Sequence, residues 1–126
     1  MVGTSIQVLG LKEVEQMLKE KSKEMIQRAD EAVKQSVFFI EGEVKESIAG
    51  HRAEHMSVDT GRFLNSVKGT KTGLMQGKVE SNVGYGQFLE YGTSKIEPRA
   101  HFRNTVARNE LKVKEMIQSE VKKISN

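Results

Sequence analysis

The strongest suggestion of chemistry in the sequence is a pair of histidines one helical turn apart. His51, Glu54 and His55 form the string His-x-x-Glu-His, a spacing that some zinc hydrolases use for two ligands and a catalytic acid. Such a site needs a continuous helix, a third ligand and a substrate cleft. The string instead follows Gly50, a residue typical of helix ends, and the chain has only one other histidine, His101. We interpret the string as a polar connecting loop, and a zinc hydrolase stays an alternative.

Two glycine-containing strings are similar to nucleotide-binding sequences but lack parts of them. Gly73-x-x-x-Gly77-Lys78 is one residue short of a phosphate-binding loop and has no Ser or Thr after the lysine. Gly84-Tyr85-Gly86 has no third glycine and no βαβ setting. The sequence contains no recognisable Ser/His/Asp set, and the absence of cysteine removes thiolate nucleophiles and ligands. We therefore expect no enzymatic activity, no metal and no cofactor.

The net charge of +3 is concentrated in the last third of the chain. Residues 95–126 carry eight lysines and arginines against four glutamates. A small basic nucleic-acid-binding protein that uses its C-terminal helix is therefore the alternative function. The acids are interleaved with the basic residues, however, and pairs such as Glu110 and Lys114 indicate a solvated helix face.

Length and composition predict one domain spanning residues 1–126. No run approaches the roughly 18 apolar residues of a membrane span, and the first residues do not have the pattern of a signal peptide. We expect no membrane partner and synthesis in the cytoplasm.

The stretch from Tyr85 to Arg103 contains both tyrosines, two of the five phenylalanines and the only proline. It predicts a short helix ending at Tyr91, then Gly92 in the left-handed conformation that closes a helix. After a polar loop, Pro98 would open a second helix at its first position. The aromatic side chains belong either to a buried corner or to a rigid loop presented to another protein chain.

The order of short motifs in this part of the chain resembles the neck or tail-completion family of long-tailed bacteriophages and prophages. The motifs are Asp59-Thr60-Gly61-Arg62 with Asn65-Ser66 after it, then Glu90-Tyr91-Gly92-Thr93, then Pro98-Arg99-Ala100-His101-Phe102-Arg103. The family often has Pro-Phe-Leu-Arg-Pro at the last helix entry, where this chain has Ala100-His101-Phe102-Arg103-Asn104. The match covers roughly the last seventy residues.

The resemblance implies a structural virion protein of a siphovirus-type phage that completes the tail and joins it to the head. It implies self-assembly into a ring, commonly a hexamer, with contacts to other neck and tail proteins and passive contact with DNA in the channel. It also implies assembly in the host cytoplasm followed by a place in the virion.

The first half of the chain predicts one strand and a long helix. Ser5–Leu9 alternates as a strand does, and Leu11, Val14 and Leu18 share one helical face. A polar run then favours a bend or break near Ser22, or a stretch of helix that crosses solvent. From there a stripe of seven small or branched apolar residues predicts one uninterrupted helix between its ends: Ile26, Ala29, Val33, Val37, Ile40, Val44 and Ile48.

Phe38 and Phe39 widen the apolar face of this helix. They indicate either a second packing surface, against another subunit, or a single broad core contact. Gly42 lies off the stripe and weakens the helix by about 1 kcal/mol relative to alanine.

The second half predicts a hairpin between short helices. Asp59 is suited to cap a turn that carries Arg62, whose guanidinium would be available to a carboxylate such as Glu90. Ser66–Lys71 and Lys78–Val83 read as strands joined by a loop that exposes Leu74 and Met75. A last helix runs from about Arg99 into the 120s, with its apolar stripe interrupted near Asn109.

Together these elements predict an α+β fold. A small antiparallel sheet of about three strands would carry a long N-terminal helix packed on it, followed by a C-terminal helix. The residues that we expect at interfaces with other protein chains are Phe38, Phe39, Arg62, Tyr85, Phe88, Glu90, Tyr91, Gly92, Thr93, Pro98 and Phe102.

Overall fold

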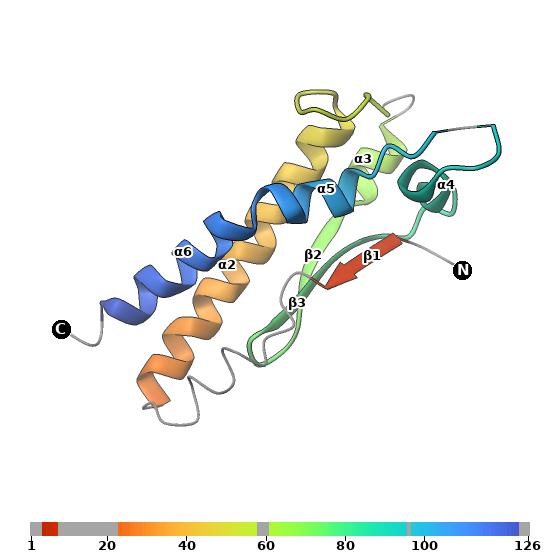
Figure 1. Ribbon diagram of the computed structural model, residues 1–126. Coiled ribbons are helices and arrows are strands. Elements are labelled where there is room, and N and C mark those ends of the chain that lie inside the picture. The colour runs from red at the N-terminus through yellow and green to blue at the C-terminus, as the bar shows by residue number, and fades with distance from the viewer. Residues whose placement is uncertain (1–3, 8–22, 58–60, 96, 124–126) are drawn as a thin grey trace.

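The computed structural model describes residues 4–7, 23–57, 61–95 and 97–123, with the side chains of all but the first of these ranges. It has the α+β architecture that the sequence predicts: a small antiparallel sheet, one long helix packed on it and further helices at the C-terminal end (Figure 1). The expected helical face from Leu11 to Leu18, the break near Ser22 and the cap at Asp59 lie outside the described residues.

The long helix α2 spans Lys23–Ile48 without interruption, which confirms the prediction from the apolar stripe. From Ala29 onward, each of the six residues in the stripe is at most 1% exposed. Phe39 lies half-buried against this core, whereas Phe38 points away from it and is 52% exposed. The periodicity of the sequence is therefore sufficient to place this helix and its buried face.

The sheet has three strands in the order β1-β3-β2, all antiparallel. The strands are β1 (Thr4–Gln7), β2 (Lys68–Gly73) and β3 (Gln76–Ser81). β2 begins two residues later than predicted, because the short helix α3 (Arg62–Ser66) occupies the residues before it. The hairpin turn consists of Leu74, which is 65% exposed, and Met75, which is 3% exposed. The prediction that both residues are exposed is therefore wrong for Met75.

Val37 packs into a slot that two strand glycines leave open. A Cβ atom built on Gly69 would lie 2.6 Å from Val37 Cγ1, and one on Gly77 would lie 2.3 Å from Val37 Cγ2. Real Cβ atoms do not approach this closely, so α2 can lie this near the hairpin only where those residues are glycine.

Two carboxylates of α2 also hold the hairpin. Glu41 Oε1 accepts the backbone N–H of Gly69 at 2.7 Å. Asp30 accepts the backbone N–H of Met75 at 2.9 Å and pairs with the Lys71 ammonium. Burial acts to raise the pKa of Asp30, but the contacts with Lys71 and Met75 outweigh it and lower the pKa.

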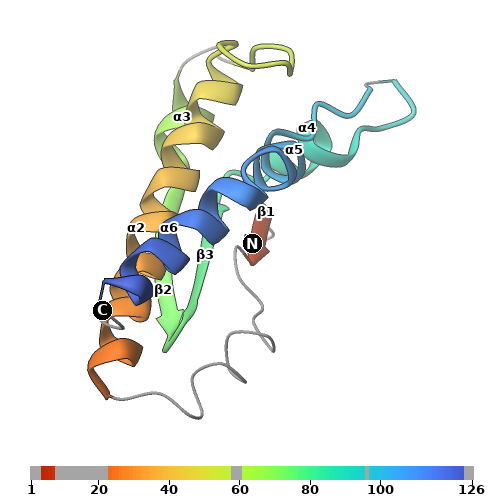
Figure 2. The same ribbon diagram turned by 60° about the vertical axis from the view of Figure 1, so that its left-hand side comes forward.

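The predicted last helix is two helices, α5 (His101–Arg108) and α6 (Glu110–Lys122), with a break at Asn109 where the stripe is interrupted. Figures 1 and 2 show them running along one side of α2 while the hairpin follows another. The prediction that Pro98 opens the helix is wrong. Leu89 O accepts the backbone N–H groups of Arg99 and Ala100, at 2.7 and 3.3 Å, so these residues are tied to an earlier segment and the helix starts only at His101.

None of the helices in the described part of the chain is both long enough and apolar enough to span a membrane.

Replacing Gly77 by alanine is expected to lower the free energy of unfolding by about 1–3 kcal/mol, because the added methyl group collides with Val37. Gly42→Ala is the matched control. No heavy atom lies within 4 Å of a Cβ at that helical position, so this variant should gain about 0.5–1 kcal/mol. Urea unfolding of both variants measures the difference. Equal effects of the two substitutions would contradict the close approach of α2 to the hairpin.

Candidate protein-interaction site

Three aromatic side chains project from the short helix α4 (Gly86–Tyr91) and the residue before it. Tyr85 is 42% exposed, Phe88 53% and Tyr91 57%, and together we call them the aromatic surface. The opposite side of α4 is buried, because Leu89 packs against the core and Glu90 is only 1% exposed. So many exposed aromatic rings on one short element are characteristic of protein contact surfaces.

Two rings of the aromatic surface, Tyr85 and Tyr91, contact other side chains of the fold. Tyr85 meets Phe63 of α3 edge to face, with ring centroids 5.8 Å apart. Phe63 in turn lies 6.5 Å from the buried ring of Phe102. The Arg103 guanidinium lies 4.5 Å from the centroid of the Tyr91 ring, a cation–π arrangement.

The carboxylate of Glu90 joins α4 to the start of α5. Oε1 accepts the backbone N–H of Phe102 at 2.9 Å, and Oε2 accepts the backbone N–H of Arg103 at the same distance. The Arg103 side chain adds a bond from Nε to Oε2 at 3.0 Å and one from Nη2 to the Glu90 carbonyl. A carboxylate here satisfies two N–H groups that the first turn of the helix leaves without partners.

Gly92 ends α4 at φ 78° and ψ 175°, and its N–H donates to Phe88 O at 2.8 Å. The sequence predicted a left-handed helical residue here. The structure has a positive φ with an extended ψ instead, a region that is essentially restricted to glycine. The need for glycine is confirmed, but the chain leaves α4 in a more extended direction than predicted.

The residues predicted at interfaces divide into exposed and buried groups. Arg62, Thr93 and Pro98 are exposed and Gly92 is half-buried. Glu90 and Phe102 are almost fully buried, so in this fold their side chains support the aromatic surface from within. Among the described residues, the guanidinium paired with Glu90 belongs to Arg103 and not to Arg62 as expected.

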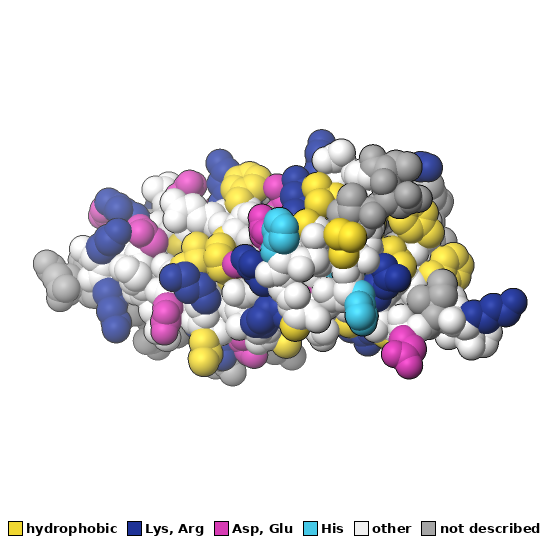
Figure 3. All heavy atoms as spheres, turned by 90° about the horizontal axis from the view of Figure 1, so that it is seen from above, with side chains coloured by type: hydrophobic (Ala, Val, Ile, Leu, Met, Phe, Trp, Pro, Cys, Tyr) yellow, Lys and Arg dark blue, Asp and Glu magenta, His cyan; other side chains and the backbone are white. Residues whose placement is uncertain are grey.

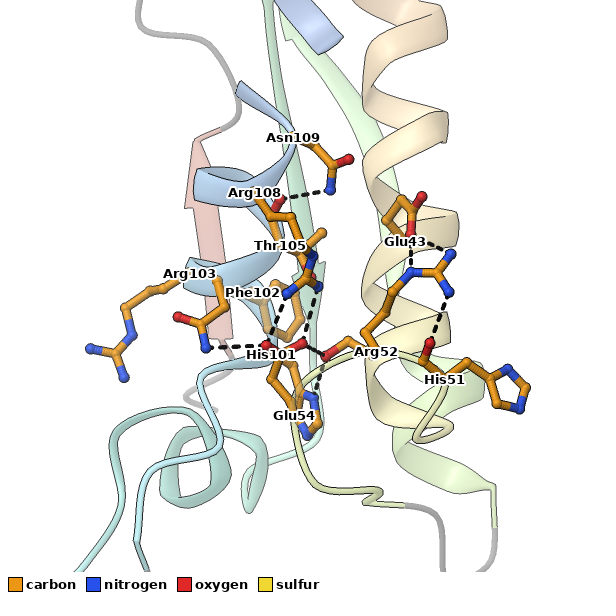
Figure 4. Close-up of polar contacts among 12 residues, drawn as sticks. Glu43, His51, Arg52, Glu54, His101, Phe102, Arg103, Thr105, Arg108 and Asn109 are labelled. Carbon is orange, nitrogen blue, oxygen red and sulfur yellow. Dashed lines mark hydrogen bonds and ion pairs between the residues drawn. The ribbon is translucent and has the colours of Figure 1, made fainter. Parts of the chain in front are cut away.

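A second polar cluster surrounds His101, whose side chain is fully buried at the start of α5 (Figure 4). Its Nδ1 lies 2.7 Å from Ser47 Oγ, and its Nε2 lies 2.7 Å from Ser57 Oγ. Ser47 also donates to Glu54, whose two carboxylate oxygens accept from Arg108 at 3.0 and 3.1 Å. The cluster therefore ties α2 and the loop after it to α5.

The electrostatics of this cluster favour a charged Glu54 and a neutral His101. Burial acts to raise the pKa of Glu54, but hydrogen bonds from Arg108, Ser47 and Asn104 outweigh it and lower the pKa to about 2. Burial lowers the pKa of His101 to about 4, against the attraction of Glu90 and Glu54.

Ser57 and His101 are in contact as a serine nucleophile and its general base would be. The groups around His101 nevertheless favour a structural role for this pair. The second ring nitrogen of His101 contacts a serine hydroxyl where hydrolases place a carboxylate. A fully buried imidazole with a pKa near 4 is also a poor base at neutral pH.

The histidine string also has structural partners. His51 Nδ1 lies 2.6 Å from Glu46 Oε2, and Glu54 is bound to Arg108. Within the described ranges, no three His, Asp or Glu residues gather as metal ligands would.

Sequence reasoning missed the parts played by His101, Ser47 and Arg108. Their contacts join positions more than fifty residues apart, and no local pattern marks such pairs.

The family comparison decides what kind of protein this is. Residues 12–92 match the family model described as "Bacteriophage HK97-gp10, putative tail-component". The chain belongs to this family of bacteriophage tail components. No curated protein and no solved structure was found to match the sequence.

The family match includes α2, the hairpin and α4, and it ends at the glycine that closes α4. The aromatic surface therefore lies at the end of the matched region. α5 and α6, which hold α4 through Glu90, lie beyond it.

The basic residues of this tail component are largely engaged within the chain. Arg103 pairs with Glu90, Arg108 with Glu54, Lys114 with Glu110 and Lys123 with Glu120. On the face in Figure 3, lysine and arginine side chains are scattered among acidic and apolar ones. This distribution does not favour the alternative of a nucleic-acid-binding protein, which would gather its cations in one patch or groove.

Glu90→Gln is expected to lower the free energy of unfolding by about 2 kcal/mol, because the carboxylate is buried and its hydrogen bonds are charge-assisted. Amide exchange of Phe102 and Arg103 should accelerate. Glu97→Gln, at an exposed position of the following loop, is the control and should change stability by less than about 0.5 kcal/mol. If Glu90→Gln were as stable as the control, the carboxylate would not hold α5.

Proposed function

We propose that this chain completes the tail of a siphovirus-type phage or prophage and takes part in joining the tail to the filled head. It does so as a ring of identical copies that also contacts neighbouring neck and tail proteins. Membership of the tail-component family supports a role in the phage tail. The observation that carries the proposal is the aromatic surface, three exposed rings on one short helix, of which Tyr85 rests on the buried Phe63 and Tyr91 on the Arg103 guanidinium.

A closed ring needs two different patches on each subunit, because head-to-tail contacts join unlike surfaces. The aromatic surface is the first patch. The second is the exposed face of α2 around Phe38, which is 52% exposed. One helical turn further on is Gly42, which has no side chain, and nothing lies within 4 Å of a Cβ built there. The helix backbone beside Phe38 is therefore not covered by neighbouring atoms. A neighbouring copy could approach the helix backbone there.

Six copies, passive contact with DNA in the channel, assembly in the host cytoplasm and a final place in the virion follow from the family resemblance. The role is structural and needs no cofactor. The exposed rings supply the apolar area that such contacts use, since aromatic side chains bury a large surface with few rotatable bonds.

Phe88→Ser tests the aromatic surface. We expect a folded protein with nearly unchanged stability, because the ring is 53% exposed, and at least a tenfold loss of self-association or of joined particles. Leu111→Ser is the matched control, since Leu111 is an even more exposed apolar residue, at 74%, on α6. Sedimentation velocity on the protein and electron microscopy of lysates measure the two effects. If both variants assembled equally well, the aromatic surface would not be a subunit contact.

Gly92→Val tests the direction in which the chain leaves α4. A β-branched residue at φ 78° and ψ 175° costs about 1–3 kcal/mol, less than a domain of this size can lose before it unfolds. We expect a folded monomer that assembles poorly, with heads and tails accumulating unjoined. Gly84→Ala is the control, because nothing lies within 4 Å of a Cβ there. Circular dichroism measures folding and electron microscopy measures joining, and a normal yield of particles from Gly92→Val would contradict this role of the loop.

A further inference from the structure

The buried His101 lies in the middle of a hydrogen-bond chain whose direction is fixed at both ends. The chain consists of Arg99, Ser57, His101, Ser47 and Glu54, and we call it the polar latch. At one end the Arg99 guanidinium can only donate, here to Ser57 Oγ at 2.8 Å. At the other end the Glu54 carboxylate accepts the proton of Ser47.

These ends determine the tautomer of the imidazole. Because Ser47 uses its single proton for Glu54, its oxygen must accept from Nδ1–H of His101. Nε2 is then left as an acceptor for the Ser57 hydroxyl proton. Each serine hydroxyl in the latch donates one hydrogen bond. Every group in the chain has its donor or acceptor partner only when His101 is neutral.

The latch holds the loop after α2 against α5. The loop turns back at Gly50, where φ is 87°, and Ser57 N–H donates to Ile48 O at 2.7 Å. From there its contacts with the C-terminal segment are polar. Arg99 donates to Met56 O at 2.8 Å, and Glu54 accepts from Asn104 and Arg108.

We propose that the polar latch is an acid-sensitive switch, in which protonation of His101 frees Ser57, at the end of the loop of residues 51–57, from His101 and Arg99. A second ring proton on Nε2 would face the Ser57 oxygen, which already accepts from Arg99. The Ser57 proton would have to turn elsewhere, and its next acceptor, His55 O, lies 3.5 Å away. The new positive charge would also oppose the neighbouring guanidinium of Arg99. The Ser57 and Arg99 end of the latch is therefore the end that opens.

Charged groups face His101 from several elements. Glu54 in the loop and Glu90 in α4 attract a protonated ring, and Arg99 repels it. Both carboxylates are already neutralised by partners in α5, Arg108 for Glu54 and Arg103 for Glu90. Burial is the largest effect and lowers the pKa of His101 from 6.5 to about 4.

The direction of the pH effect follows from this lowering. Above pH 6.5 the ring is neutral in both the closed and the open latch, so the closed state has its full stability. As the pH falls toward 4, only the open state takes up the proton, and the closed state loses stability. By pH 4.5 the opening equilibrium should have increased about 50-fold relative to pH 7.

Two NMR measurements on the full chain test the switch. Long-range ¹H–¹⁵N spectra of the imidazole should show the neutral Nδ1–H tautomer at pH 7 and a titration well below pH 6. Amide exchange of Ser57, corrected for the intrinsic effect of pH, should lose about 50-fold protection between pH 7 and 4.5. Amides of β3 should keep their protection, whereas an equal loss there would mean global unfolding and would overturn the proposal.

Three variants complete the test. His101→Asn cannot titrate in this range and should abolish the pH dependence at Ser57. His55→Asn, an exposed histidine in the same loop, should leave it intact. Ser57→Ala keeps His101 but removes the hydroxyl at Nε2, so the loop should already exchange faster at pH 7. A pH dependence that persists in His101→Asn, or an Nε2–H tautomer in the native chain, would overturn the proposal.

Discussion

The carboxylate of Glu90 is the contact on which the proposed interaction surface depends. It is 1% exposed and accepts two backbone N–H groups of α5 together with the Arg103 side chain. A buried carboxylate without partners is costly, so α4 and α5 must meet in this arrangement for either to be stable. The same contact turns the remaining side of α4 outward. Glu90 and Arg103 thus bind each other, and Tyr85, Phe88 and Tyr91 on the remaining side of α4 are exposed as a consequence.

Helix α2 supplies the frame behind this contact. Its Val37 fits between two strand glycines, while Asp30 and Glu41 hold the hairpin by backbone N–H groups. Another side of the helix carries α5 and α6, and Ser47 near its end reaches the buried His101. The only large apolar side chain of α2 that stays mostly exposed is that of Phe38, within the described residues. The faces of α2 that meet the hairpin, α5 and α6 are therefore tightly packed, whereas its face around Phe38 is exposed and is where we propose that a neighbouring copy binds.

Local patterns in the sequence predict α2, the hairpin and α4, because each depends on a periodicity or on residues that end an element. They do not predict where α5 starts, since Arg99 and Ala100 donate to Leu89 O on the other side of a loop, a contact that no local pattern marks. The same reason explains why Arg62 was expected to pair with Glu90, and why His101 was treated as an isolated histidine. For the proposed site, the sequence singles out the stretch from Tyr85 to Arg103, and its role as an interface stays a prediction. Only the structure separates its exposed rings from the buried Glu90 and Phe102 that support them.

A cryo-electron microscopy reconstruction of the tail end that contains this protein would test the central claim most directly. Our account predicts a closed ring in which Tyr85, Phe88 and Tyr91 of each copy are buried against the Phe38 face of α2 in the next copy. A reconstruction in which α4 faces solvent, or in which the copies meet through other surfaces, would contradict it.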